Sequence, residues 1–126
     1  MRAVVYDAGA LIAADRNTRL FWAEHRARLE MGIVPGVPAP IVSQVSRSPK
    51  QAQLRRLLRG CDVVALDEER AHRVGALLGR SKTSDIADAA VVVVAAALRA
   101  DIVTSDPDDI EHLLASARAK LRVVPP

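Results

Sequence analysis

The stretch that decides the fold is SDIADAAVVVVAAALRADIVTSDPDD, residues 84–109. It begins with two acids, Asp85 and Asp88, and continues with the apolar run Ala89–Leu98, which predicts a buried helix. A short β-branched run follows and predicts a strand that ends at Asp106. Helix, strand and loop in this order form one unit of a parallel sheet, with carboxylates at the helix start and at the strand end.

The first predicted strand of the chain, Arg2–Tyr6, is also closed by an acid, Asp7. Open parallel sheets bind their ligands outside the carboxyl ends of their strands, where Asp7 and Asp106 both stand. The helix that starts near Asp88 can fold back so that its first turn faces the same rim. Three carboxylates at one rim predict a site for Mg²⁺, which prefers oxygen ligands.

The remaining segments alternate between strand and helix, as expected for one domain covering residues 1–126. The alternation predicts a three-layer αβα fold with a central, mostly parallel sheet of four to five strands. Pro35 and Pro38 argue against a central position for the extended segment they occupy. The expected further helices are 8–14, 16–31, one opened by Pro40, 49–60, 68–78 and 107–120, and the further strands are 33–38, 62–66, 101–104 and an edge strand at 122–124.

The composition suits helices that pack closely on a sheet. Half of the residues are hydrophobic, mostly Ala, Val and Leu, and only Tyr6, Phe21 and Trp22 are aromatic. No apolar run approaches the ~20 residues that span a bilayer, so no membrane association is expected. Asp7 interrupts the apolar N-terminal stretch, which predicts a strand and helix rather than a signal peptide. The lone Cys61 fits a reducing compartment, and we expect a cytoplasmic protein.

The charges are unevenly distributed along a chain whose net charge is +3. Arginines crowd residues 16–28 and 47–59, whereas aspartates gather between residues 85 and 109. An acidic pocket in a basic surface suits a metal-dependent nuclease, since the acids hold the cation and the arginines attract phosphates. Arg47 and Arg55 are candidate RNA contacts, although a solvated helix face explains any single arginine here more readily.

Two of the acids have a simpler structural explanation. Asp7 lies between a strand and a helix, where an acid often caps the helix. Asp106 precedes Pro107 and two further aspartates, a pattern typical of a helix start with an N-cap, a proline at the first position and acids in the first turn.

Asp85 and Asp88 are three residues apart at a helix start and therefore share a face. Capping can explain Asp85 but explains Asp88 less well, because Asp88 precedes a run without polar residues until Arg99. A carboxylate partly buried at the start of an apolar helix needs an arginine, backbone N–H groups or a metal as its partner. No basic residue lies one turn away on this helix, which favours the metal.

Thr104 and Ser105 can orient the adjacent acid or a metal-bound water, or they are simply small polar residues at a strand exit. His25, His72 and His112 lack metal-ligand spacing and lie in helices predicted to be exposed, so we expect surface residues. The glycines form neither a dinucleotide-binding motif nor a P-loop, so no nucleotide cofactor is indicated.

These features together resemble the PIN-domain family, in particular the small VapC-type toxins of toxin–antitoxin pairs. The resemblance rests on Asp7 after the first strand, on Asp88-Ala89 opening an apolar helix, and on Thr104-Ser105-Asp106 after a strand. The last two acids are 18 residues apart, and the resemblance extends from residue 2 to about residue 124.

The resemblance implies a ribonuclease that depends on Mg²⁺ or Mn²⁺, with Asp7, Asp88 and Asp106 as catalytic and metal-binding residues. It adds Asp85 and Asp109 as neighbouring acids. It also implies an RNA substrate, a homodimer and a small VapB-type antitoxin whose tail enters the acidic groove.

One position departs from the family pattern. The family usually places a glutamate on the helix after the proline-rich strand, and here the matching position in Pro40–Val45 is Gln44. An amide oxygen can still ligate magnesium or accept a hydrogen bond from its water, but it carries no charge. The departure implies weaker metal binding.

The predicted chemistry is hydrolysis of an RNA phosphodiester by a metal-activated water. Gln44, Asp85, Thr104, Ser105 and Asp109 would position waters and ligands around the metal. The alternative is a PIN-like protein, catalytically weakened by its glutamine, that only binds RNA or its antitoxin. A phosphotransfer receiver-like domain is a third reading, and it lacks the paired acids expected after the first strand.

Overall fold

The structure is a computed structural model that describes residues 2–126. Its five strands form one sheet in the order β3-β2-β1-β4-β5, and every pair of neighbours is parallel. This confirms the predicted α/β class and sheet. The strands are short: β1 Val4–Tyr6, β2 Gly36–Pro38, β3 Asp62–Val64, β4 Asp101–Val103 and β5 Val123–Val124.

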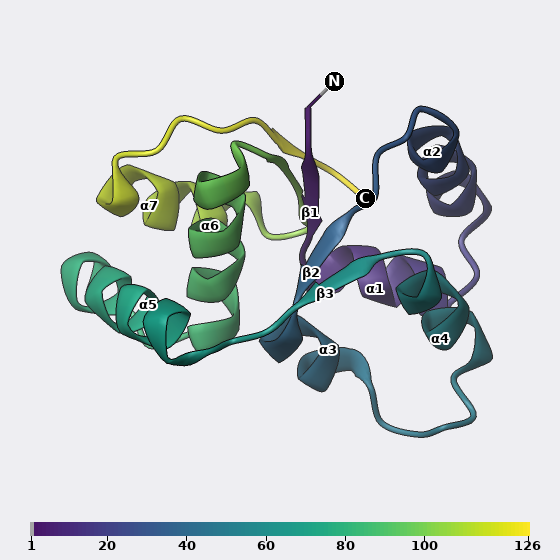
Figure 1. The fold of residues 1–126 in the computed structure, drawn as a ribbon, viewed down its shortest axis with the longest axis horizontal. Coiled ribbons are helices and arrows are strands. Elements are labelled where there is room, and N and C mark those ends of the chain that lie inside the picture. The colour runs from purple at the N-terminus through teal and green to yellow at the C-terminus, as the bar shows by residue number, and fades with distance from the viewer. Residues whose placement is uncertain (1) are drawn as a thin grey trace.

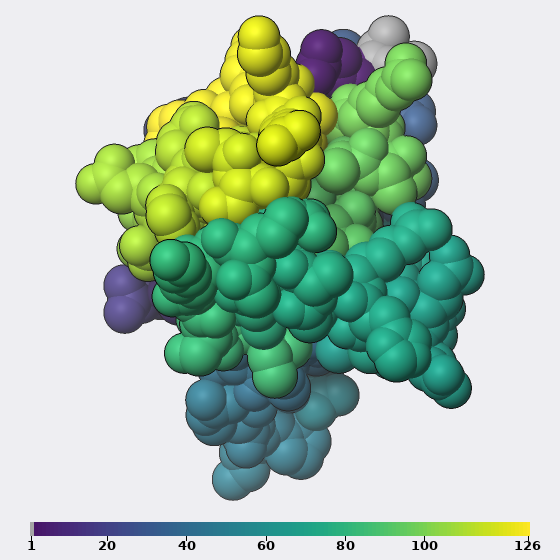
Figure 2. Space-filling model, turned by 90° about the vertical axis from the view of Figure 1, so that its left-hand side faces the viewer, coloured from purple at the N-terminus to yellow at the C-terminus, as the bar shows by residue number. Residues whose placement is uncertain are grey.

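Seven helices cover the sheet in the described residues. Figure 1 shows α5, α6 and α7 together on one side and α1, α2 and α4 on the other, so the fold has the predicted three layers. In the side view of Figure 2, α5 and the yellow C-terminal part of the chain form much of the visible face. The helices are α1 Ala8–Asp15, α2 Arg19–Glu30, α3 Ala39–Val45, α4 Ala52–Arg59, α5 Glu68–Ser81, α6 Ile86–Leu98 and α7 Pro107–Ala117.

The expectation that the proline-rich segment avoids a central position is wrong, because β2 lies between β3 and β1. The prolines are tolerated because they stand at the two ends of a very short strand. Pro35 precedes the strand, and its carbonyl oxygen still accepts a hydrogen bond from Asp62 N at 2.9 Å. Pro38 is the last residue of β2, so its missing N–H removes no bond from the middle of the ladder.

Several helix boundaries differ from the expected ones by a few residues. The second helix begins at Arg19 rather than residue 16, because Asn17 has a left-handed backbone with φ of 57°. Helix α4 begins at Ala52, α5 continues to Ser81, and α7 ends at Ala117. Such shifts reflect the weak local signal at helix ends, where backbone geometry decides.

Helix α6 is the apolar helix at the centre of the prediction. From Ala87 to Ala95 every apolar residue except Val93 is buried, and the helix packs on α3, α5, α7 and three strands. The last turn is exposed, with Leu98 at 49%. The prediction of a helix buried on all sides therefore holds only for the apolar residues between Ala87 and Ala95, with Val93 as the exception. No helix in residues 2–126 is long and apolar enough to cross a membrane.

Asp101 anchors both ends of the described chain to β4. Its side chain is buried, and it accepts hydrogen bonds from Arg2 Nε at 2.7 Å and from Arg122 Nη2 at 3.0 Å. Two guanidinium partners satisfy a charge that would otherwise be costly to bury. The pair of contacts holds the residues before β1 and β5 against the amino end of the strand between them.

The expectation that His25 lies at the surface is wrong, since only 3% of the residue is exposed. His25 lies one helical turn after Phe21, so both face the sheet. Its Nδ1 is 2.8 Å from the Tyr6 hydroxyl, and Arg28 Nη1 donates to the same hydroxyl at 3.1 Å. Burial, followed by the charges of Arg28 and Arg56, lowers the pKa of His25, consistent with a neutral ring that accepts at Nδ1.

Helix α1 approaches the loop after β4 so closely that only glycine fits at Gly9. A Cβ atom added there would lie 2.4 Å from Ser105 Oγ, 2.8 Å from Ser105 Cβ and 3.0 Å from Ser105 N. Rotating the serine hydroxyl would relieve the first contact but not the other two. Gly9 therefore sets the distance between the first turn of α1 and the loop that carries Asp106.

We expect Gly9→Ala to lower the free energy of unfolding by about 1–3 kcal/mol, because the added methyl group forces α1 away from the β4–α7 loop. The matched control is Gly75→Ala in α5, where an added Cβ meets no atom within 4 Å. That variant should gain about 0.5–1 kcal/mol from the higher helix propensity of alanine. Urea unfolding of both variants measures the difference, and equal stabilities would contradict the close approach.

Candidate functional site

The site is built on the pairing of β1 with β4. Tyr6 is opposite Val103 in the register, so the next residues, Asp7 and Thr104, lie side by side at the carboxyl ends of the two strands. Thr104 Oγ1 donates to Asp7 Oδ2 at 2.6 Å and accepts from Asp106 N at 3.0 Å. One buried hydroxyl therefore joins the two acids that follow the strands.

Asp7 also caps helix α1, as its simpler explanation predicted. Its Oδ1 accepts from Ala8 N at 2.8 Å, while Oδ2 accepts from Thr104. The side chain is almost completely buried. Burial raises the pKa of Asp7, the two hydrogen bonds oppose this shift, and the negative charges of Asp106 and Asp85 add to it. Capping does not exclude a further role, because carboxylate oxygens can each accept more than one bond.

Asp85 and Asp88 begin α6 in different ways. Asp85 is the N-cap, and its Oδ1 accepts from Asp88 N at 3.0 Å. The half-buried carboxylate of Asp88 makes no hydrogen bond or ion pair within residues 2–126. Burial, and then the charges of Asp7, Asp85, Asp109 and Asp106, raise the pKa of Asp88 to about 7. The prediction that capping explains Asp85 better than Asp88 is confirmed.

The simpler explanation of Asp106, that its side chain caps α7, is not supported by the structure. It holds the position before α7, and Pro107 opens that helix as expected, but the Asp106 side chain makes no capping hydrogen bond. The residue is exposed. Asp108 and Asp109 occupy the first turn of α7, where negative charge suits the helix dipole.

Two hollows meet at Asp109. One of about 310 Å³ lies between the start of α6 and α7, and the other, of about 250 Å³, follows the loop after β4. The first is lined by Thr83, Ser84, Asp85, Asp88, Asp109, His112 and Leu113, and the second by Ser105, Asp106, Pro107, Asp108 and Asp109. The carboxylates thus surround a shared concave region, which we call the acidic hollow.

The charges of neighbouring acids act on Asp7 and on Asp88, but the acids do not converge on one point. No group of three or more His, Cys, Asp or Glu side chains within residues 2–126 is arranged so that it could already hold a metal ion. The carboxylates nonetheless suit a hard cation, because they offer oxygen donors and lack ion-pair partners in this part of the chain. Mg²⁺ usually keeps several of its waters and binds through one or two carboxylates. The magnesium site at Asp7, Asp88 and Asp106 stays a prediction.

Gln44 does not line the acidic hollow. It is exposed on α3, a helix that packs on both α1 and α6, whose first turns carry Asp7 and Asp88. The fold therefore places this helix beside the site.

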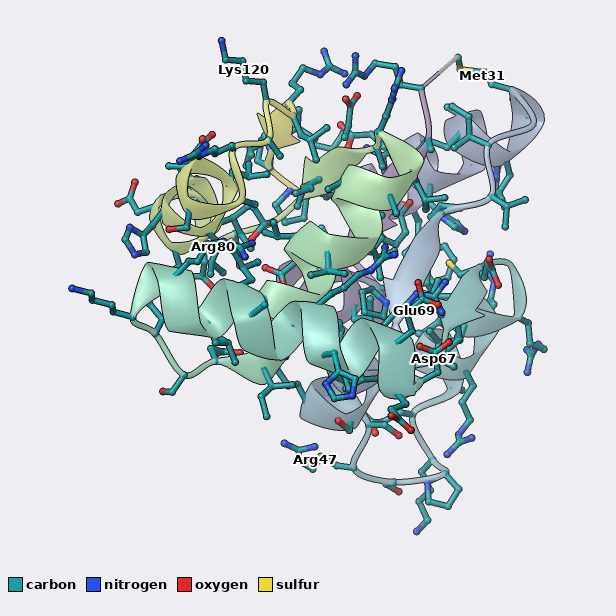
Figure 3. The ribbon with its side chains drawn as sticks, turned by 60° about the vertical axis from the view of Figure 1, so that its left-hand side comes forward. Met31, Arg47, Asp67, Glu69, Arg80 and Lys120 are labelled. Carbon is teal, nitrogen blue, oxygen red and sulfur yellow. The ribbon has the colours of Figure 1, made fainter. Side chains whose placement is uncertain are left out.

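The predicted RNA contacts Arg47 and Arg55 are both exposed. The guanidinium of Arg47 donates to the carbonyl oxygens of Ser43 and Ser46 at 2.7 and 3.0 Å, and so closes the end of α3. Figure 3 shows Arg47 at the lower edge of the molecule, away from Arg80 on α5. Their role in RNA binding stays a prediction.

Sequence reasoning missed the direct bond from Thr104 to Asp7 and the place of His112. Exposed as expected, His112 also lines the acidic hollow, and its Nε2 is 3.0 Å from the Ser81 carbonyl oxygen. His112 follows Asp109 by about one turn on the same face of α7, and this spacing was the available signal.

Asp88→Asn should stabilise the metal-free protein at pH 8. The folded pKa of about 7 lies above the ordinary 3.8, so the folded state binds the proton more tightly than the unfolded chain. Wild-type stability should therefore rise, relative to the variant, as the pH falls from 8 towards 5. We expect the variant to melt about 2–6 °C higher at pH 8 and to lose this advantage at pH 5.

Calorimetry in EDTA at both pH values measures this difference. His25 titrates in both proteins and cancels in the comparison. Asp108→Asn is the matched control on α7, and it should not change the pH dependence. An Asp88→Asn protein that follows the wild-type pH dependence would refute the crowding of charge at Asp88.

Thr104→Val should lower the free energy of unfolding by about 1–3 kcal/mol, because it leaves buried Asp7 Oδ2 without its donor. Thr104→Ser keeps the hydroxyl and should lose less, mainly the packing of one methyl group. Urea unfolding at pH 8 measures both. A valine variant more stable than the serine variant would show that the hydroxyl bond contributes little.

No protein-family model and no curated protein matches this sequence. The fold is similar to a solved structure described as VapBC2 from Rickettsia felis bound to a DNA fragment from their promoter. The superposition has a TM-score of 0.66 and covers 98% of each chain, with 13% sequence identity. At this identity the likeness concerns the architecture, and it supports a PIN-like three-layer αβα fold for the chain.

Proposed function

We propose that the chain is a divalent-metal-dependent endoribonuclease of the VapC toxin type, acting at the acidic hollow. One observation carries this proposal: Asp85, Asp88, Asp106 and Asp109 line one concave region, and none of them has an ion-pair partner within residues 2–126. Burial and the charges of four neighbouring carboxylates also raise the pKa of Asp88. Side chains that only stabilise a fold rarely gather like charges in this way, whereas functional sites do so. A divalent cation would relieve the repulsion.

Asp7, Asp88 and Asp106 would hold Mg²⁺ or Mn²⁺, mostly through water. The bound metal would supply a water of lowered pKa and neutralise charge on the phosphate. Asp7 is the most rigid of the three, because both of its oxygens are fixed by donors. Asp106 is exposed and uncapped, so its carboxylate is free to turn towards an incoming phosphodiester.

The surrounding residues have supporting roles in this proposal. Asp85 and Asp109 line the hollow and would orient waters, and Ser105 stands beside Asp106 at its rim. The acidic hollow would repel RNA when no cation is present. Binding of the scissile phosphate therefore requires the metal, while the rest of the strand is attracted by arginines elsewhere.

The second candidate function is binding without cleavage. Its support is Gln44, which replaces the charge expected on α3 and lines neither part of the hollow. In that case the chain would only hold RNA or a small VapB-type antitoxin. We propose a small VapB-type antitoxin as partner under either function, since the similar structure is described as VapBC2. A homodimer is proposed from the family resemblance alone.

RNA cleavage in the presence of Mg²⁺ or EDTA tests the function. Asp106→Asn is the decisive variant, because its side chain makes no bond that the fold requires, and it should lose at least tenfold in rate. Asp7→Ala should also be inactive, with some loss of stability. Gln44→Glu should keep or raise the rate, since it adds a negative charge on α3, the helix that packs on both α1 and α6.

Glu111→Gln changes an exposed acid of α7 that lines neither part of the acidic hollow, so it controls for charge on α7. Cleavage that persists in identically purified Asp106→Asn would reveal a contaminating ribonuclease. Equal cleavage by wild type and Asp106→Asn, or cleavage that EDTA does not stop, would refute the nuclease proposal. Tight RNA binding by a wild type that cuts no RNA, together with cleavage gained in Gln44→Glu, would support the binding function instead.

A further inference from the structure

A further hollow, separate from the acidic hollow, lies between helices α2 and α4. Its volume is about 390 Å³. Figure 1 shows both helices at the far end of α1 from β1. Since α1 has eight residues, this end is about 12 Å from Asp7. The lining residues are Asn17, Arg19, Trp22, Ala23, Arg26 and Arg56, and we call this region the arginine hollow.

The arginine hollow contains three guanidinium groups and no acid. Within residues 2–126, none of Arg19, Arg26 and Arg56 lies within 4.0 Å of a carboxylate, although Arg28, at the other end of α2, pairs with Glu24. Three unneutralised guanidinium groups around one concavity repel one another. An anion bound among them would remove that repulsion.

Two constraints hold Arg56 in place before any ligand arrives. Its Cζ lies 4.3 Å from the centroid of the Trp22 ring, and its Nη1 donates to Gln53 Oε1 at 3.2 Å. Trp22 is itself fixed, because its Nε1 donates to Ala14 O at 3.2 Å. A guanidinium group that is already ordered loses less entropy when it binds an anion.

The start of helix α2 is a separate indication of an anion-binding site. Thr18 stands at the N-cap but makes no side-chain bond to the helix, so the first backbone N–H groups are not capped by a side chain. Arg19 is the first residue of the helix, and no acid lies in its first turn. A cation at this position opposes the helix dipole and is unfavourable for folding alone. A bound anion would satisfy both the N–H groups and the arginine.

We propose that the arginine hollow binds phosphate groups of an RNA strand, at a site distinct from the acidic hollow. The choice of RNA rests on the proposed function. Phosphate suits three planar guanidinium forks and uncapped N–H groups. A peptide partner would need an apolar anchor pocket, but Arg56 covers a face of the indole, which is the one large apolar group of the hollow.

Trp22 is the only tryptophan of the chain, so its fluorescence reports on this hollow alone. We would titrate a short oligouridylate into the full chain in EDTA, where cleavage is stopped and the acidic hollow repels RNA. The emission of Trp22 should change in a saturable way that added salt reverses. Anisotropy of a labelled oligouridylate would measure affinity without relying on the indole.

Arg19→Gln and Arg26→Gln should each weaken RNA binding roughly threefold to tenfold, since each removes a phosphate contact. Each should also reduce the slope of log K against log salt concentration by about 0.7. Arg73→Gln is the matched control: it removes one exposed arginine from α5, on the other side of the sheet, and should change affinity less than twofold. Circular dichroism and melting temperatures confirm that the variants are folded.

The outcomes separate this proposal from the nuclease proposal. If Arg19→Gln and Arg26→Gln bind RNA as tightly as Arg73→Gln does, the arginine hollow is not an RNA site, whatever Asp106→Asn does to cleavage. A Trp22 response to polyglutamate but not to oligouridylate would likewise overturn it and indicate an acidic peptide. Weakened binding in both variants would support the arginine hollow even if no RNA were cut.

Discussion

The hydrogen bond from the Thr104 hydroxyl to the Asp7 carboxylate is the constraint on which the candidate site depends. It exists because β1 and β4 are adjacent and parallel, with Tyr6 opposite Val103. The same hydroxyl accepts from Asp106 N, so the loop after β4 is fixed relative to the start of α1. Gly9 permits the contact of α1 with this loop, and the acids of α6 and α7 then complete the concave region. Local strand register thus brings together Asp7 and the loop of Asp106, which are 99 residues apart in the chain.

Much of this arrangement could be predicted from the sequence. The apolar run of α6, the strand signals on either side and an acid after each strand are local patterns, and parallel sheets bring such strand ends to one rim. The order of the strands in the sheet could not be predicted from such local patterns, because it depends on tertiary packing. Pro35 and Pro38 suggested a peripheral strand, yet strand length allowed a central one, since the prolines fall at its ends. The capping of α1 by Asp7 was foreseeable, and the lack of capping by Asp106 was not.

Contacts between distant segments account for the rest. His25 looked like a surface residue because its own helix is polar, but Tyr6 and Arg28 supply a buried hydrogen-bond network for it. The arginine hollow combines α2 with α4, and neither helix alone indicates a concavity. The acidic hollow and the arginine hollow carry opposite charge. Crowded acids lie at one end of α1, and unpaired arginines lie at the other. A polyanion would be attracted to one end of this helix and would need a cation at the other.

The double contact of Asp101 has a topological consequence. Arg2 and Arg122, near opposite ends of the described chain, both reach the same buried carboxylate, so the two ends of the fold are neighbours in space. A short peptide could join them, and the backbone could be opened instead in the exposed connection between α3 and α4, with every strand pair retained. The order in which the elements follow one another along the chain is therefore separable from the arrangement that creates the acidic hollow.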